Sequence, residues 1–283
     1  MGDYHRPETL NEALALLSRP GARIAAGCTD LFPATQACAL EGVVIDVTGI
    51  SALQGITDAH DGLRIGAAAT WTDLIRADLP PACDMLKEAA REVGSVQIQN
   101  AGTIVGNICN ASPAADGVPC LLALDAMVEL VSSNGTRQLP LHQFLTGPRQ
   151  TALRDAEIVT AIGLPRSALR GASRFLKLGA RKYLVISIAM VAARVHVQDG
   201  RVAEAALCIG ACSAVATRVP LVEAALVGQR FDEELPGLVT DAQVASVVSP
   251  ITDIRADGAY RTHAAAELLR RALADLTSER VTA

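Results

Sequence analysis

The spacing of apolar residues predicts a chain that mixes helices with strands along its whole length. Apolar side chains at positions 10, 13, 14 and 17 follow the helical period, whereas the apolar run at 23–26 has the length of a short strand. Proline and glycine at positions 20 and 21 separate the two elements. Further predicted elements are helices over 32–40, 72–76, 84–93 and 118–124, strands over 43–47, 127–131 and 157–164, and a hairpin within 54–67.

A second pattern begins after residues 165–171, which are polar and interrupted by proline and glycine. Such a segment is typical of a domain boundary, so we expect one unit over 1–168 and another over 169–283. Beyond it, two long apolar runs at 185–197 and 202–209 flank an aspartate–glycine turn, which predicts a long antiparallel hairpin. The remaining predicted elements are a strand over 174–178 and helices over 221–226, 238–247 and 263–276.

Composition narrows the class of protein. Of the 283 residues, 50% are hydrophobic, 19% charged and 3% aromatic, and the net charge is −5. The sequence contains no apolar run near the about 20 residues of a membrane helix, and its N-terminus does not resemble a secretory signal. We therefore expect a cytoplasmic protein without membrane insertion. Scattered basic residues argue against a nucleic-acid partner. Seven cysteines without a Cys-x-x-Cys pair indicate reduced thiols, not a disulfide framework or a metal site.

One segment, residues 102–116, stands out as a candidate ligand-binding loop. It clusters glycine, asparagine and hydroxyl side chains in a stretch that looks too irregular for a helix or strand, and it ends at Asp116 before an apolar helix. Glycine lets backbone N–H groups approach a phosphate closely. Thr103, Asn107 and Asn110 can add side-chain hydrogen bonds.

A second segment of the same kind lies upstream, where the apolar run 24–26 stops at Gly27-Cys28-Thr29-Asp30 before an amphipathic stretch from Leu31. This order predicts a strand, a tight turn and a helix start. Free N–H groups and the positive end of the helix dipole then point at one place, which suits a diphosphate. Either segment alone is equally well explained as an ordinary turn, but two of them in one domain favour a binding site.

Together these motifs resemble the FAD-binding medium subunit of the molybdenum hydroxylases, the group that includes xanthine dehydrogenase and aerobic carbon monoxide dehydrogenase. Family members show an Ala-Gly-Gly-Thr-Asp loop, which residues 26–30 match. They also show a Gly-Thr-Ile-Gly-Gly-Asn loop followed by Ala-Ser-Pro-Ala-Ala-Asp, which residues 102–107 and 111–116 match. Residues 177–182 and 253–261 add to the resemblance, which spans nearly the whole chain.

The resemblance implies an α+β flavoprotein of two domains. Its FAD-binding domain would contain two α/β subdomains, and its C-terminal domain a three-stranded antiparallel sheet with helices. In such proteins both glycine loops contact the FAD diphosphate, Ile158 or Val159 packs near the flavin, and Lys177 approaches the pyrimidine edge, where a cation stabilises the reduced ring. A solvated strand-end lysine is the alternative for Lys177. Carried over by position, the implied FAD contacts are Ile24, Ala25, Ala26, Gly27, Cys28, Thr29, Asp30, Leu31, Gly102, Thr103, Gly106, Asn107, Asn110, Asp116, Ile158 and Lys177.

The chain departs from the family pattern at two positions where a glycine is usual, Cys28 and Val105. A side chain there is harmless if φ is negative and obstructs the diphosphate if φ must be positive. Of the two, we expect Val105 to be the weak point of the loop. Tyr183 has two interpretations: it shields one face of the flavin, or it is a core or subunit-contact residue.

The implied function is electron transfer, with no catalytic side chain or metal ligand in this chain. Electrons would arrive from iron–sulfur centres, pass through FAD and leave to NAD⁺ or another acceptor. The implied partners are a large subunit that carries the molybdopterin cofactor and a small 2Fe–2S subunit. Two alternatives stay open, a flavin-free scaffold subunit of the same assembly and a stand-alone flavin oxidoreductase.

Overall fold

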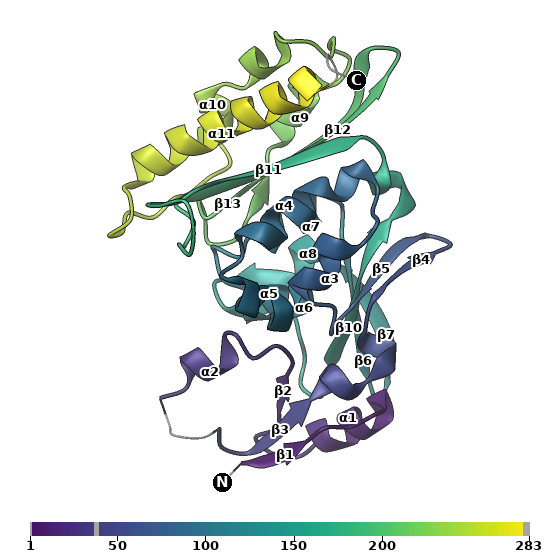
Figure 1. Ribbon diagram of the computed structural model, residues 1–283. Helices are drawn as coiled ribbons and strands as arrows, with labels where there is room; N and C mark the ends of the chain where they lie inside the picture. Colours follow the sequence, from purple (N-terminus) through teal and green to yellow (C-terminus); the bar gives the residue numbers. More distant parts are fainter. Residues whose placement is uncertain (1, 37–39, 280–283) are drawn as a thin grey trace.

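The N-terminal segment folds into a small sheet of three parallel strands. The computed structural model, which describes residues 2–36 and 40–279, shows the strands in the order β1, β3, β2 (Figure 1). The helix α1 begins after Thr9, whose hydroxyl accepts a hydrogen bond from the N–H of Glu12, and it buries Ala13. The bounds are β1 (Asp3–His5), α1 (Leu10–Leu17), β2 (Arg23–Ala25), α2 (Leu31–Ala34) and β3 (Val43–Asp46).

The predicted helix over 32–40 is a single turn, α2, because the backbone is already extended at Thr35. Residues 37–39 of that prediction lie outside the described residues. The predicted strands on either side of α2 are present as β2 and β3, which pair in parallel.

A five-stranded antiparallel sheet forms the second subdomain, in the order β4-β5-β10-β6-β7. Its central strand β10 is buried along most of its length, as expected for a strand with neighbours on both sides and a helical layer over it. In Figure 1 the helices from α3 to α8 lie between this sheet and the C-terminal sheet. The bounds are η1 (Val47–Gly49), η2 (Ser51–Leu53), β4 (Ile56–Ala59), β5 (Gly62–Gly66), α3 (Trp71–Arg76), η3 (Pro81–Cys83), α4 (Asp84–Glu92), α5 (Val96–Ala101), α6 (Ile104–Asn110), α7 (Gly117–Ala123), β6 (Met127–Ser132), β7 (Gly135–Pro140), α8 (Leu141–Phe144), β8 (Leu145–Gly147), β9 (Gln150–Thr151), β10 (Ile158–Pro165) and η4 (Arg166–Leu169).

Helices pack against both faces of the C-terminal sheet. Successive strand residues point to opposite faces, so Met190 and Ala192 of β12 join the core shared with the N-terminal domain, whereas Val191 and Ala193 face the C-terminal helices. Three long strands form the predicted sheet, and the two-residue β14 adds a fourth strand that was not predicted. The bounds are β11 (Ala172–Leu178), β12 (Ala189–Gln198), β13 (Arg201–Gly210), β14 (Thr217–Arg218), α9 (Pro220–Leu226), η5 (Leu235–Leu238), α10 (Asp241–Ala245) and α11 (Gly258–Glu279).

The segment predicted to be too irregular for a helix contains one, so that prediction is wrong. The helix α6 begins after Thr103, whose hydroxyl accepts a hydrogen bond from the N–H of Gly106, and it ends at Asn110, before Ala111 with its φ of +48°. Glycine and asparagine are poor helix formers. The helix forms because its apolar positions, such as Ile104 and Ile108, are completely buried in the core.

The proposed boundary at residues 168/169 falls within η4, between the last strand of the second subdomain and the first strand of the C-terminal sheet. Among the described helices, none combines the length and the apolar character needed to cross a membrane.

Candidate functional site

The two candidate loops pack directly against each other at Gly27 and Gly102. A Cβ atom on Gly27 would lie 1.9 Å from the carbonyl oxygen of Ala101 and 2.7 Å from Cα of Gly102. A Cβ atom on Gly102 would lie 3.2 Å from Oγ1 of Thr29. Only glycine allows backbones to approach this closely. The turn after β2 and the start of α6 therefore form one continuous surface.

This surface lines a cavity of about 570 Å³, a size within the range of small-molecule sites. A more polar hollow of about 660 Å³ shares Ala26, Gly27 and Thr103 with it, so the loops run between two spaces. The cavity is lined by Ile24, Ala26, Gly27, Cys28, Thr29, Asp30, Leu31, Ala34, Val47, Ala67, Trp71, Val93, Ile98, Thr103, Val105, Gly106, Asn107, Cys109, Asn110, Leu153, Glu157, Ile158 and Val159.

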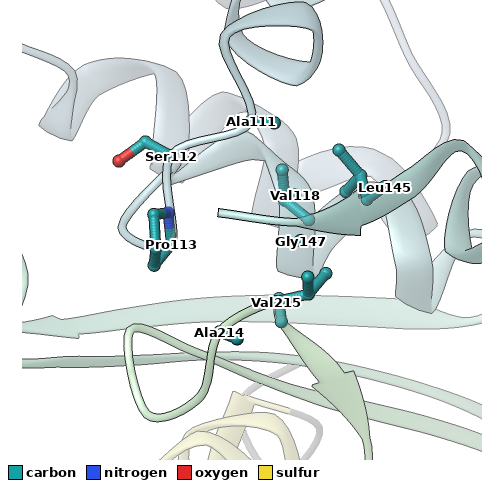
Figure 2. A pocket seen from close by; sticks show the side chains of 9 residues that line it. Ala111, Ser112, Pro113, Val118, Leu145, Gly147, Ala214 and Val215 are labelled. Carbon is teal, nitrogen blue, oxygen red and sulfur yellow. The ribbon is translucent and has the colours of Figure 1, made fainter. Parts of the chain in front are cut away.

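A third hollow, at the contact between the two domains, is too small for a cofactor. Figure 2 shows it between Ser112, Val118, Leu145 and Val215, and its volume is about 10 Å³. That is room for about one water molecule. It is therefore excluded as a cofactor site, unlike the two larger hollows beside the loops.

The first loop presents backbone N–H groups that have no acceptor in the described part of the chain. Within residues 2–36 and 40–279, the N–H groups of Gly27, Cys28, Thr29 and Asp30 donate to no backbone or side-chain oxygen. Cys28 has a left-handed φ of +57°, whereas Asp30 has right-handed backbone angles. Turns that mix the two conformations turn successive N–H groups toward one concave spot that binds anions. Because Gly27, Cys28 and Thr29 are half-buried and Asp30 is exposed, their N–H groups are open to a ligand, and the turn fits an anion such as a diphosphate.

Cys28 and Val105 replace the usual glycines of the two loops, and the structure shows that Cys28, not Val105, has the strained backbone. Val105 lies inside α6 with helical backbone angles and is 4% exposed, so the prediction that it is the weak point is wrong. Cys28 is the residue at positive φ, a conformation that costs an L-residue about 1–2 kcal/mol. Its Sγ lies 3.4 Å from the carbonyl oxygen of Ala26, and burial raises the pKa of its thiol.

The polar residues of α6 and its caps differ in whether their side chains have hydrogen-bond partners in the protein. The Thr103 hydroxyl caps the helix, and the Asn110 side-chain oxygen accepts from the guanidinium of Arg149. The Oδ1 atom of Asn107 is sealed from solvent and has no donor among the described residues. Buried acceptors without a partner are costly, so this oxygen destabilises the fold locally. Because α2 has four residues and α6 seven, the free N–H groups matter more here than an extended helix dipole.

Lys177 and Asp116 form a buried ion pair beside the cavity without lining it. The Lys177 Nζ lies 2.8 Å from Asp116 Oδ2 and 3.4 Å from the carbonyl oxygen of Glu92, the residue before the cavity-lining Val93. Ser187 donates to the other oxygen of Asp116 at 2.8 Å. The Lys177 side chain is 7% exposed, so the alternative of a solvated strand-end lysine is wrong. Burial raises the pKa of Asp116, and the cation of Lys177 opposes that shift.

Sequence reasoning missed several residues of the cavity wall. Trp71 begins α3, Val93 follows α4, and Ile98 lies in the unpredicted helix α5. Glu157 sits next to the predicted Ile158 and is held by two hydrogen bonds of 2.7 Å from Arg137, which lower its pKa. The signal that could have identified Trp71 is that it is the only tryptophan and follows a threonine helix cap.

Tyr183 is 61% exposed, so the interpretation as a core residue is wrong. The ammonium of Lys182 lies 5.2 Å from its ring centroid. Within the described residues, no three side chains of His, Cys, Asp or Glu lie close enough to hold a metal ion. The described cysteines are all free thiols: Cys28, Cys83, Cys109, Cys120, Cys208 and Cys212.

Comparison with known proteins accounts for nearly the whole chain. Residues 1–167 match the FAD binding domain in molybdopterin dehydrogenase, and residues 174–276 match the CO dehydrogenase flavoprotein C-terminal domain. The chain is 31% identical over 281 residues to the putative xanthine dehydrogenase FAD-binding subunit of Escherichia coli strain K12, covering 96% of this chain and 94% of that one. It is 36% identical over 222 residues to the nicotinate dehydrogenase FAD-subunit of Eubacterium barkeri, covering 74% of each.

The fold agrees with these matches. A chain of the reconstituted CO dehydrogenase from Oligotropha carboxidovorans superposes with a TM-score of 0.90 at 28% identity, and the match covers 98% of both chains. The predicted α+β class and the FAD cofactor are therefore confirmed. This chain belongs to the family of FAD-binding subunits of molybdenum hydroxylase-type dehydrogenases.

Proposed function

We propose that this chain is the electron-transfer subunit of a heteromeric molybdenum hydroxylase. The observation that supports it most is the row of free N–H groups at Gly27–Asp30, placed where two glycine loops meet beside a large cavity. That donor set fits the diphosphate of FAD. When bound, FAD supplies the redox chemistry, because it can exchange electrons one or two at a time.

The residues of this chain hold and shield the cofactor. The loop amides would bind the diphosphate, and the apolar wall formed by Val93, Ile98 and Ile158 would enclose ring surfaces and exclude water. The ion pair of Lys177 with Asp116 ties β11 to the start of α7 next to that wall. The FAD contacts carried over from the resemblance remain our proposal for the binding residues.

We place the other redox centres on partner chains. The relatives are named as FAD-binding subunits and as the medium chain of carbon monoxide dehydrogenase, which supports an assembly of several chains. In our proposal a small 2Fe–2S subunit delivers the electrons, a large molybdopterin subunit oxidises the substrate, and NAD⁺ or another carrier is the acceptor. Free thiols throughout the described core support a location in the reducing cytoplasm.

Purification through a tag on this chain tests the proposal. We expect one FAD per chain, together with one chain that carries molybdopterin and one that carries 2Fe–2S. A chain that purifies alone and reduces acceptors without partners would instead support the stand-alone oxidoreductase. Colourless protein that stays colourless after incubation with FAD would support the flavin-free scaffold.

A further inference from the structure

Trp71 is the only tryptophan of the chain, and its side chain lies between the two parts of the candidate site. Its backbone N–H donates to the carbonyl oxygen of Gly102 at 3.1 Å, and the residue is 2% exposed. The ring atom Cδ1 lies 3.3 Å from the Cβ position of Gly102, and Cη2 lies 2.7 Å from the Cβ position of Gly117. The indole therefore spans from the second loop to the start of α7, and the two glycines make room for it.

The indole N–H has no acceptor among the described residues. Over the part of the chain that the structure describes, no backbone or side-chain atom accepts its proton, and Nε1 is not sealed from solvent. Because Trp71 lines the cavity and is otherwise buried, the accessible part of the ring faces that cavity. Buried tryptophans usually give their N–H a partner. The donor is therefore left for a ligand.

The N–H lies at the place where the two loops meet. Nε1 is bonded to Cδ1, the ring atom near Gly102, and the Cβ position of Gly102 is also 3.2 Å from Oγ1 of Thr29. Among the described residues that line the cavity there is no lysine or arginine. A diphosphate at this junction would be held by neutral N–H donors, so each additional donor has a measurable share in binding.

We propose that Trp71 is a binding residue of the FAD site and that its indole N–H donates a hydrogen bond to a diphosphate oxygen. It would add a side-chain donor to the backbone N–H groups of Gly27–Asp30. The inference rests on FAD binding by this chain and assigns one contact within that site.

Nuclear magnetic resonance of the full-length ¹⁵N-labelled chain tests the contact directly, because one tryptophan gives one indole N–H signal. With saturating FAD we expect the indole proton to shift downfield and its exchange with water to slow. An indole signal that saturating FAD leaves unchanged would overturn the proposal. A chain that binds no FAD would overturn the FAD site itself, so the two failures are distinguishable.

Two variants measure how much the indole N–H contributes to FAD affinity. Trp71→Phe keeps a ring and removes the N–H, so FAD affinity should fall about tenfold, and competition by ADP should weaken by a similar factor while riboflavin binding stays the same. Trp71→His keeps a ring N–H and should recover part of the loss. Circular dichroism and the thermal midpoint report whether each variant folds. Wild-type FAD affinity in a folded Trp71→Phe chain would overturn the proposal. So would a variant that binds riboflavin more weakly while ADP still competes as well as in the wild type.

Discussion

Replacing Gly27 by alanine tests whether the close approach of the two loops forms the FAD site. The added Cβ would lie 1.9 Å from the carbonyl oxygen of Ala101 and 2.5 Å from its carbonyl carbon, whereas Cβ atoms essentially never come within 3.0 Å of another heavy atom. The loops must therefore separate by roughly 1 Å, and overpacking of this kind costs about 1–3 kcal/mol. Without FAD the loops can relax apart, but a cofactor that contacts both loops requires the native approach. The strain is then subtracted from the binding energy, so FAD affinity should fall about 5- to 150-fold.

Isothermal titration of the flavin-free chain with FAD measures this change. Gly237→Ala is the matched control, because Gly237 has no positive φ and an added Cβ there meets nothing within 4 Å. The control should bind FAD with wild-type affinity. Wild-type affinity in the Gly27→Ala chain as well would refute the reasoning, since FAD binding would then not depend on contact between the two loops.

Three further changes test the strain and the ion pairs around the site. Cys28→Gly relieves the positive φ and should raise the free energy of unfolding by up to about 1 kcal/mol in urea denaturation, after allowing for the larger unfolded-state entropy of glycine; a clear loss of stability would contradict this. Lys177→Met leaves Asp116 buried without its cation and should cost about 3–5 kcal/mol, and adding Asp116→Leu should recover most of it; an equal loss in both chains would argue against the buried pair. Arg137 holds the pKa of Glu157 below its ordinary 4.5, so the pair stabilises the fold at neutral pH and that contribution is lost as pH falls through the lowered pKa. Arg137→Met should therefore be less stable than wild type at neutral pH, with the difference shrinking in acid; a difference that does not depend on pH would exclude this linkage.

Elements with a clear hydrophobic period could be predicted from the sequence. The long hairpin of β12 and β13 was predicted because both strands are apolar runs joined by an aspartate–glycine turn. The helix α6 was missed because its glycine and asparagine residues favour other structures, and only its buried contacts with the rest of the core make it helical. Local sequence shows propensity, but it does not show which weak helix the tertiary core will stabilise.

The same distinction applies to the site. Glycine composition identified both loops, and Gly27 and Gly102 do lie against each other. The rest of the cavity lining could not be predicted, because Trp71, Val93 and Ile98 come from α3, the end of α4 and α5, whose relative positions depend on the whole core. The positive φ of Cys28 could not be predicted either, since sequence alone does not show which of two non-glycine residues adopts it.

The most direct test of the central claim is anaerobic spectroscopy of the assembled complex purified through this chain. Because xanthine, carbon monoxide and nicotinate dehydrogenases are among the relatives, a panel containing xanthine, carbon monoxide and nicotinate is a reasonable first choice of electron donor. With a donor that the complex oxidises, our account predicts that the iron–sulfur and flavin absorbance both bleach, and that the flavin absorbance returns when the acceptor is added. A complex that contains FAD and oxidises its substrate while the flavin absorbance stays unchanged would contradict the account.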